Sequence, residues 1–184
     1  PMRTTQFQST TVRIPRSCSS DQSSHRNLKT NGINMAHFLV TGGAGFIGSH
    51  ICEFLIRQTD HTVTVLDNLL TGSVSNLGTF LTRLNFVEGD ITDSELLQRT
   101  LRGVDYIIHQ AALPSVPRSI SDPEKSNWNN VNGTLKLLIE ARDAGVKRVV
   151  AASSSSVYGS NPALPKIESL PTSPKSPYAL TKLT

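Results

Sequence analysis

Short apolar runs alternate with segments of helical periodicity from residue 37 onwards. The runs that resemble buried strands are residues 37–41, 62–66, 84–88, 104–109 and 146–152. Apolar residues recur at helical spacing over about 46–58, 94–102 and 124–144. This alternation is typical of a parallel sheet covered by helices on both faces, so we predict a doubly wound α/β (Rossmann) fold. Ligands of such folds bind at the carboxyl ends of the strands.

A glycine-rich turn joins the first predicted strand to the first predicted helix. The sequence from residue 41 to 50 is TGGAGFIGSH, with the spacing GxxGxxG. Bare backbone at glycine can approach a phosphate, and a helix N-terminus offers unpaired N–H groups and a partial positive charge. We therefore predict a dinucleotide site whose contacts include Gly42, Gly45, Phe46, Ile47 and Gly48.

Acidic residues follow the second and third predicted strands. Asp67, followed by Asn68, can accept both hydroxyls of an adenosine ribose and repel a 2′-phosphate, which favours NAD over NADP. Asp90 can accept from an adenine amino group while Ile91 packs against the ring. An alternative of equal weight is that Asp90 caps the helix that starts near Ser94.

The fourth strand ends in His109, followed by Gln110 and two alanines. Small side chains at Ala111 and Ala112 let backbone approach the cofactor. We interpret His109 as a core-edge histidine bonded to backbone, in preference to a catalytic base. Several asparagines on one predicted helix are unfavourable for helix formation, so some of them must hold a ligand or backbone, and we assign Asn129 to the cofactor.

The fifth strand delivers hydroxyls to the same edge of the sheet, because it runs into four serines, Ser153–Ser156. A proline-rich stretch over 160–177 is predicted to be a loop. Tyr178 and Lys182 then lie four residues apart on one face of a helix. A cation beside a phenol lowers the phenol pKa, so we expect Tyr178 to serve as an acid or base near neutrality.

Composition excludes some classes of function. The chain has a formal charge of +4, but residues 1–34 carry all of it and the other 150 residues are neutral, which argues against nucleic-acid binding. No run of eighteen apolar residues is present, so we predict no membrane span. The cysteines, Cys18 and Cys52, fit no metal or disulfide spacing, and Cys52 is expected in the core.

We divide the chain into a disordered basic tail, residues 1–34, and an NAD-binding Rossmann domain, residues 35–184. The tail is rich in Ser and Thr and has too few large apolar residues to fold alone. A disordered extension, or upstream sequence before a start at Met35, is preferred to an organelle transit peptide. We therefore expect a cytoplasmic protein.

These motifs resemble the extended short-chain dehydrogenase/reductase family, in particular its NAD-dependent sugar-nucleotide epimerases and dehydratases. The resemblance runs continuously over residues 37–184 and includes HQAA at 109–112, NNVNGT at 129–134, SSSSVYG at 153–159 and YALTK at 178–182. It implies NAD as cofactor, Ser154 as the catalytic hydroxyl, Tyr178 as the base, and Lys182 as the residue that holds the nicotinamide ribose.

The resemblance also narrows the reaction. Dehydratases of the family follow the catalytic hydroxyl with Asp-Glu, whereas this chain has Ser155 and Ser156. A 4-epimerase is therefore favoured, with a UDP-glucuronate decarboxylase as the alternative. The segment 112–120 is similar to a loop of epimerases that act on UDP-N-acetylhexosamines, although Pro114 replaces their usual Gly. We assign Ser115 and Ser154 to the nucleotide-sugar substrate, which we expect to be UDP-linked, and leave a homodimer open.

The family's chains continue beyond the position of Thr184 with further strands and a substrate lobe. We therefore expect this chain to be the N-terminal part of a longer enzyme, incomplete and inactive alone. The alternative is a non-catalytic NAD-binding fragment.

Overall fold

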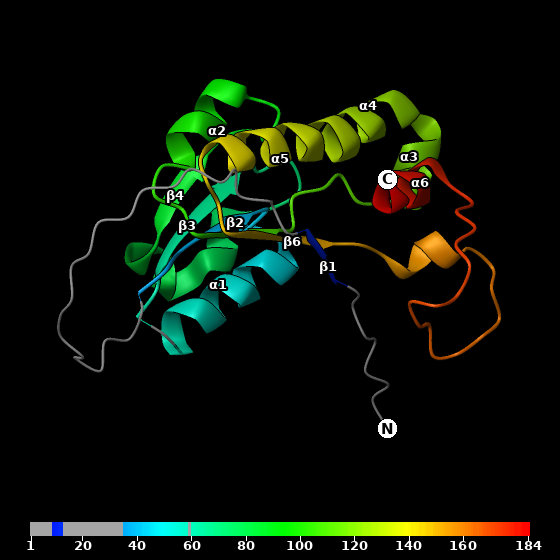
Figure 1. Cartoon of the computed structure of the whole chain (residues 1–184), viewed down its shortest axis with the longest axis horizontal. Helices are drawn as coiled ribbons and strands as arrows, with labels where there is room; N and C mark the ends of the chain where they lie inside the picture. Colours follow the sequence, from blue (N-terminus) through cyan, green and yellow to red (C-terminus); the bar gives the residue numbers. More distant parts are fainter. Residues whose placement is uncertain (1–8, 13–34, 59) are drawn as a thin grey trace, which may run out of the picture.

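The computed structural model describes residues 9–12, 35–58 and 60–184 (Figure 1). They form a six-stranded sheet in the order β1-β6-β5-β2-β3-β4. The strands are β1 Ser9–Val12, β2 His37–Thr41, β3 Thr62–Asp67, β4 Asn85–Glu88, β5 Tyr106–His109 and β6 Arg148–Ala152. Strands β2 to β6 are parallel and β1 is antiparallel to β6. The predicted Rossmann-type sheet is confirmed, with its switch point between β2 and β5.

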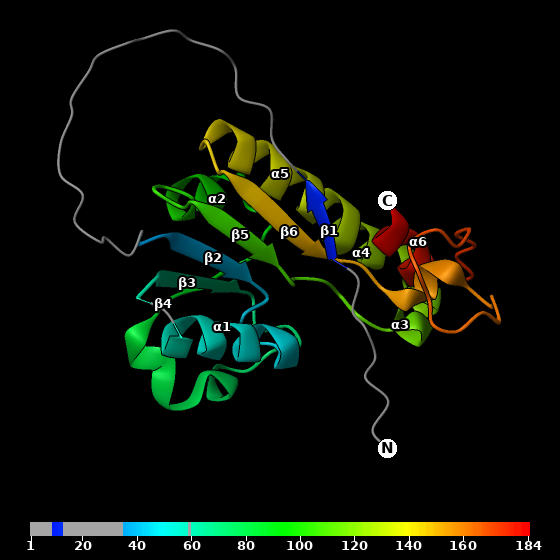
Figure 2. The same cartoon turned by 60° about the horizontal axis from the view of Figure 1, so that its bottom comes forward.

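Helices cover both faces of the sheet. Their bounds are α1 Phe46–Gln58, η1 Val74–Arg83, α2 Ser94–Thr100, α3 Val116–Ser121, α4 Pro123–Asn127, η2 Trp128–Asn132, α5 Gly133–Asp143, η3 Ser155–Tyr158 and α6 Pro177–Leu183. In Figure 2, α1 lies on one side of the sheet, and α2 and α5 lie on the other. The single helix predicted over 124–144 is α4 and α5 joined by the π-helical turn η2. None of the helices in the described ranges is long and apolar enough to cross a bilayer.

The core is divided in two by the sheet, because successive residues of a strand point to opposite faces. Leu39 packs towards α2 and α5, whereas Val40 packs towards α1 and η1. Cys52 on α1 is fully buried in the second core, where burial raises the pKa of its thiol to about 12. The prediction of a small core residue at this position is confirmed.

Part of the predicted disordered tail is ordered. Ser9–Val12 form β1, with Ser9 opposite Ala152 and Val12 opposite Val149. Three of the four residues are β-branched, and the edge of β6 offers unpaired backbone groups to such a segment. The structure therefore describes a strand for these four residues, where the sequence pattern predicts disorder. The rest of the tail lies outside the described residues.

Two connections contain helical segments that the sequence pattern does not predict. The loop after β5 contains the short helix α3, which begins at Val116. The connection between β3 and β4 contains η1, whose Leu77 is fully buried against α1. Both segments lack apolar periodicity long enough to be recognised as helices. Of the predicted loop over 160–177, residues 160–176 contain no helix or strand, as expected, and Pro177 begins α6.

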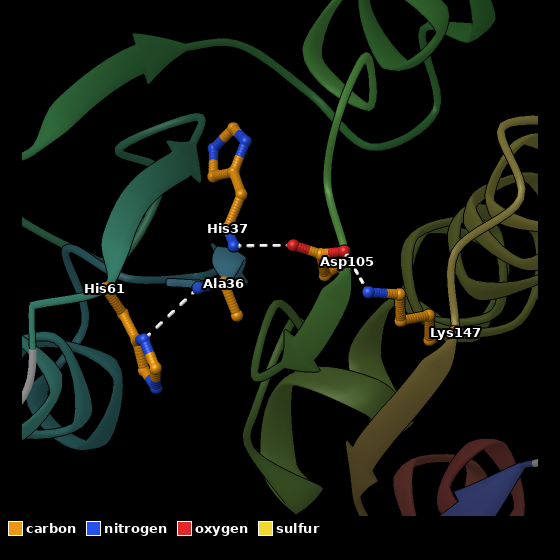
Figure 3. A network of polar contacts seen from close by, with 5 residues as sticks. All are labelled: Ala36, His37, His61, Asp105 and Lys147. Atoms are coloured by element: carbon orange, nitrogen blue, oxygen red, sulfur yellow. Dashed lines mark hydrogen bonds and ion pairs between the residues drawn. The ribbon is translucent and has the colours of Figure 1, made fainter. Parts of the chain in front are cut away.

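Polar contacts tie the amino ends of four strands, β2, β3, β5 and β6, together (Figure 3). The Asp105 carboxylate accepts from the His37 backbone N–H at 2.9 Å and pairs with the Lys147 ammonium at 2.6 Å. The His61 ring Nδ1 accepts from the Ala36 N–H at 3.3 Å. The hydrogen bond from Lys147, followed by that from His37, lowers the pKa of Asp105. This network lies at the amino ends of the strands (the amino edge), whereas ligands of such folds bind at the carboxyl ends (the carboxyl edge).

Candidate functional site

A cavity of about 660 Å³ lies at the carboxyl ends of the parallel strands. Its size is within the roughly 300–1,000 Å³ usual for small-molecule and cofactor sites. All but one of the predicted site residues line it: Gly42, Gly45, Phe46, Ile47, Gly48, Asp67, Asn68, Asp90, Ile91, Ala111, Ala112, Asn129, Ser154, Tyr178 and Lys182. Only Ser115 is not part of the lining. The fold thus brings residues from distant parts of the sequence to one cavity.

The glycine turn is held tightly between α1 and the end of β5. Gly42 has a φ of 69°, and a Cβ there would lie 2.6 Å from the Ala111 N. A Cβ on Gly48 would lie 2.2 Å from the Gly42 O, so no side chain fits where the helix crosses the turn. The first N–H groups of α1, beginning at Phe46, have no intrahelical acceptor, and Phe46, Ile47 and Gly48 line the cavity. Bare backbone with free donors suits the pyrophosphate of a dinucleotide.

Asp67 fixes the turn and also lines the cavity. The residue is 8% exposed, and its carboxylate accepts from the Ala44 N–H at 2.9 Å and the Leu69 N–H at 2.8 Å. Each carboxylate oxygen has further acceptor capacity, so these two bonds leave room for ribose hydroxyls. The position at the end of β3 is the one expected for a ribose acceptor.

Asp90 does not cap α2. That role belongs to Asp93, whose carboxylate accepts from the Leu96 N–H at 3.0 Å. The capping alternative is therefore wrong. Asp90 lines the cavity and accepts from the Asn68 side chain at 2.7 Å and from Thr92 at 2.8 Å. Burial alone would raise the pKa of Asp90, but these hydrogen bonds and the Lys136 ammonium hold that pKa below its usual range.

His109 is buried beneath the cavity and bonded to two hydroxyls. Its Nδ1 lies 2.6 Å from Thr41 Oγ1, and its Nε2 lies 2.9 Å from Thr134 Oγ1. Thr134 Oγ1 donates its proton to the Asn130 carbonyl, so Nε2 must be the protonated nitrogen and Nδ1 the acceptor. The ring is buried, as a core-edge histidine should be, but the predicted backbone partner is wrong, because the partners are side-chain hydroxyls. Burial, with the Lys182 charge, lowers the pKa of His109 to about 3.

The asparagines on the π-helical turn have separate tasks. Asn130 is buried, accepts from the Leu113 N–H at 2.6 Å, and donates to the Leu113 carbonyl and to Thr181 Oγ1. It thereby joins the loop after β5 to α6, and the sequence pattern singled out Asn129 instead. Asn129 lines the cavity and donates to the Lys125 carbonyl at 2.8 Å.

The four serines after β6 differ in their hydrogen-bond partners and exposure. Ser153 Oγ donates to the Lys182 carbonyl at 3.0 Å and so ties β6 to α6. Ser154 Oγ accepts from the Ser156 N–H at 3.2 Å and from the Ser156 hydroxyl at 2.9 Å, and it is hydrogen-bonded to the Tyr178 phenol. Ser155 lines the cavity and is exposed.

Tyr178 and Lys182 line the cavity from α6, but the pKa of Tyr178 shifts in the direction opposite to the one predicted. Burial raises the pKa of Tyr178, and the hydrogen bond from Ser154 opposes this rise. Lys182 donates to the Ala152 carbonyl at 3.1 Å, and burial lowers the pKa of its ammonium. The prediction that Lys182 lowers the Tyr178 pKa is therefore wrong in this structure, where Ser154 is the group that favours the phenolate.

Ser115 begins α3 and lies outside the cavity lining. It has a φ of 111°, and its Oγ accepts from the Arg118 N–H at 3.3 Å as the helix cap. Its assignment to substrate stays a prediction. The sequence analysis missed Lys166, which lines the cavity and donates to the carbonyls of Asn161 and Ala163. A lysine in a proline-rich loop without periodicity gives no signal that would place it there.

Comparison with known proteins agrees with this geometry. The profile of a family described as "NAD dependent epimerase/dehydratase family" matches residues 38–184. A UDP-glucose 4-epimerase from Streptomyces lividans is 40% identical over 149 residues, which are 79% of this chain and 44% of that protein. The chain thus spans about half the length of the curated relatives it matches.

Solved structures give the same result. A UDP-N-acetylglucosamine 4-epimerase from Methanobrevibacter ruminantium, in complex with UDP-N-acetylmuramic acid, has a TM-score of 0.74 and 41% identity over 82% of this chain and 48% of its own. A dTDP-glucose 4,6-dehydratase from Streptomyces venezuelae, with NAD bound, has a TM-score of 0.75 and 46% identity over 80% and 48%.

Proposed function

The chain belongs to the NAD-dependent epimerase/dehydratase family, and on that premise we propose that the natural protein interconverts the C4 epimers of a UDP-linked hexose with NAD as cofactor. The observation that carries the proposal is the convergence of two groups on one cavity. The glycine turn and Asp67 form one part of its wall, and Ser154, Tyr178 and Lys182 form another.

The cofactor fits the residues that would hold it. The turn between Gly42 and Gly48 excludes side chains and presents backbone donors, as a pyrophosphate requires. Asp67 and Asp90 supply acceptors for the adenosine, and Lys182 supplies a donor for the nicotinamide ribose. When bound, NAD supplies the acceptor for oxidation at the sugar carbon.

The catalytic residues then have distinct roles. Tyr178, as phenolate, takes the proton of the C4 hydroxyl and returns it when the 4-keto sugar is reduced on its other face. Ser154 donates to the Tyr178 oxygen and stabilises the phenolate form. Lys182 adds a positive charge. Among the described residues it donates to the Ala152 carbonyl and forms no ion pair with a carboxylate.

The position of the carboxylates in the cavity favours epimerisation over dehydration. Loss of water from a sugar needs an acid and a base beside the leaving hydroxyl in addition to the oxidising residues. Among the described residues, the carboxylates that line the cavity are Asp67 and Asp90, and both belong to the predicted adenosine side. Positions 155 and 156, which follow the catalytic hydroxyl, are serines. A decarboxylase acting on a UDP-hexuronate is the alternative within the same family.

The direct test is the identity of the product. The natural protein is incubated with UDP-glucose, UDP-N-acetylglucosamine, dTDP-glucose and UDP-glucuronate, and each reaction is followed by NMR. We expect one of the first two to equilibrate with its C4 epimer, and the comparison also decides whether the sugar is acetylated. A 4-keto-6-deoxy product or a pentose as the main product would overturn the assignment.

The cellular setting is part of the same proposal. We expect a cytoplasmic protein that forms a homodimer. The dimer is suggested by exposed apolar side chains on α5 and α6, including Leu135, Ile139 and Leu180, which could contact a second copy. Light scattering after size exclusion measures the mass in solution. A monomer at working concentration would remove the dimer from the proposal without affecting the reaction.

A further inference from the structure

Ser156 is the residue that orients Ser154, although it does not itself line the cavity. The Ser156 backbone N–H and hydroxyl both donate to Ser154 Oγ, at 3.2 and 2.9 Å. A serine hydroxyl has two acceptor lone pairs and a single proton. With both acceptor positions occupied by Ser156, the proton of Ser154 is left for its remaining partner, the Tyr178 oxygen.

We propose that Ser156 is a positioning residue for the epimerase reaction, which fixes Ser154 as a hydrogen-bond donor to Tyr178. This inference rests on the proposed function, because it assigns a role within the same site. It accounts for a hydroxyl outside the cavity lining, which includes Ser153, Ser154 and Ser155 but not Ser156.

The local fold makes this contact specific to Ser156. The turn η3 begins directly after Ser154, whose extended backbone and side chain cap it. Only the residue two positions beyond the cap places both its N–H and its hydroxyl on the capping oxygen. Ser155, between them, is exposed and makes no such bond in the described part of the chain. The order of the three serines therefore decides which of them can act.

The expected effect is on the form of Tyr178 that the reaction needs. A donor fixed on the phenol oxygen stabilises the phenolate, and a Ser154 hydroxyl free to rotate does so less. The titratable and charged side chains that line the cavity with Tyr178 are Asp67, Asp90, Tyr158, Lys166 and Lys182. The pKa of Tyr178 is nevertheless governed by burial and by the Ser154 bond. Loss of the Ser156 hydroxyl should therefore raise the Tyr178 pKa.

The variants are Ser156→Ala and Ser156→Thr in the natural protein, with Ser160→Ala as the matched control because Ser160 is an exposed serine just beyond η3. Every variant keeps the backbone N–H that caps the turn. We expect Ser156→Ala to lower kcat about threefold to tenfold, the scale of one neutral hydrogen bond. The acidic limb of the kcat/KM profile should move up by about half a pH unit or more. Ser156→Thr should restore both values, and Ser160→Ala should change neither.

A double-mutant cycle decides whether Ser156 acts through Ser154. In the Ser154→Ala background, Ser156→Ala should have no further effect on kcat or on the pH profile. An equal loss in both backgrounds would overturn the proposal, as would an unchanged pH profile in the single variant. If the wild-type protein has no epimerase activity, the proposed function fails. NMR titration of carbon-labelled tyrosine, with Tyr178→Phe to assign the signal, then still tests whether Ser156→Ala raises the Tyr178 pKa.

Discussion

The two edges of the sheet use the same residue types in opposite ways. At the amino edge, Asp105 and Lys147 form an ion pair at 2.6 Å, with half of the lysine side chain exposed (Figure 3). At the carboxyl edge, Lys182 donates to a backbone carbonyl, and Asp67 accepts from backbone N–H groups. Charges that pair with each other at an exposed edge add little stability. Charges held by neutral partners in a cavity remain available to a ligand.

The histidines differ in the same manner. His61, at the amino edge, accepts from the Ala36 backbone and stacks near Phe38. His109, at the carboxyl edge, is enclosed by two threonine hydroxyls that fix its protonated nitrogen. Residue type alone would therefore not have distinguished the two edges. Burial and the kind of partner distinguish them.

The largest expected effect separates the two edges by activity. Tyr178→Phe in the natural protein should lower kcat for UDP-hexose epimerisation at least about a hundredfold, because it removes the group that transfers the proton. Tyr106 has the same hydroxyl at the amino edge, where its ring stacks on Phe38, so Tyr106→Phe should change kcat less than about twofold. A comparable loss of kcat in both variants would mean that removing either hydroxyl lowers activity by destabilising the fold.

The second effect is a pH dependence of stability caused by His109. Its pKa is about 3 in the folded protein, against 6.5 for an unperturbed histidine side chain, so between these values the unfolded chain binds more protons. The free energy of unfolding should therefore fall by about 1.4 kcal/mol for each pH unit below 6.5, or about 2 kcal/mol by pH 5. Urea unfolding at several pH values measures this slope.

The control for this effect is the exposed His50 on α1. His109→Gln should flatten the slope between neutral pH and pH 5, whereas His50→Gln should leave it unchanged. Equal slopes in the wild-type protein and His109→Gln would contradict a buried neutral histidine.

The third effect compares two carboxylates. Asp67→Ala should reduce the preference for NADH over NADPH about tenfold, the scale of one charged hydrogen bond. Asp105→Ala, which removes a carboxylate from the amino edge, should leave both affinities unchanged. Titration of cofactor fluorescence gives the six dissociation constants, for two cofactors and three proteins. NADPH binding as tightly as NADH in the wild-type protein would show that Asp67 does not read the ribose.

The smallest effect is expected for the ion pair. Asp105→Asn should lower the free energy of unfolding by less than about 1 kcal/mol, because the pair is partly exposed. The pKa of Asp105 is lowered in the folded protein, so this contribution is present above the pKa of the unfolded chain and lost as pH falls through the folded value. Urea unfolding at low and high salt, and at neutral and acid pH, checks both statements. Any change in kcat would contradict the distinction between the edges.

The proposed cofactor side of the cavity could be predicted from sequence because its determinants are local. The turn from Gly42 to Gly48 and Asp67 follow from strand, helix and strand periodicity within one βαβ unit. The carboxyl-edge position of Asp90 follows in the same way from β4. Only the choice between capping and lining needed the structure, since Asp93 competes for the cap.

The proposed catalytic side could be predicted only in part, because it depends on contacts between distant segments. The sequence spacing places Tyr178 and Lys182 on one face of a helix, but it does not show how deeply α6 is buried. Burial raises the Tyr178 pKa, which is opposite to the predicted shift. The bond between Asn130 and Thr181 joins residues 51 positions apart, which no local pattern reveals. Strand β1 was missed because its partner, β6, lies far along the chain.

The central claim is that this one cavity holds the dinucleotide along the carboxyl edge, from Asp67 to Tyr178. The most direct measurement is a crystal structure of the natural protein grown with NAD. We predict that Asp67 accepts from the adenosine ribose, that the pyrophosphate lies on the turn at Gly45, and that Lys182 donates to the nicotinamide ribose. A dinucleotide bound elsewhere, or one whose nicotinamide lies away from Tyr178 and Lys182, would contradict the claim.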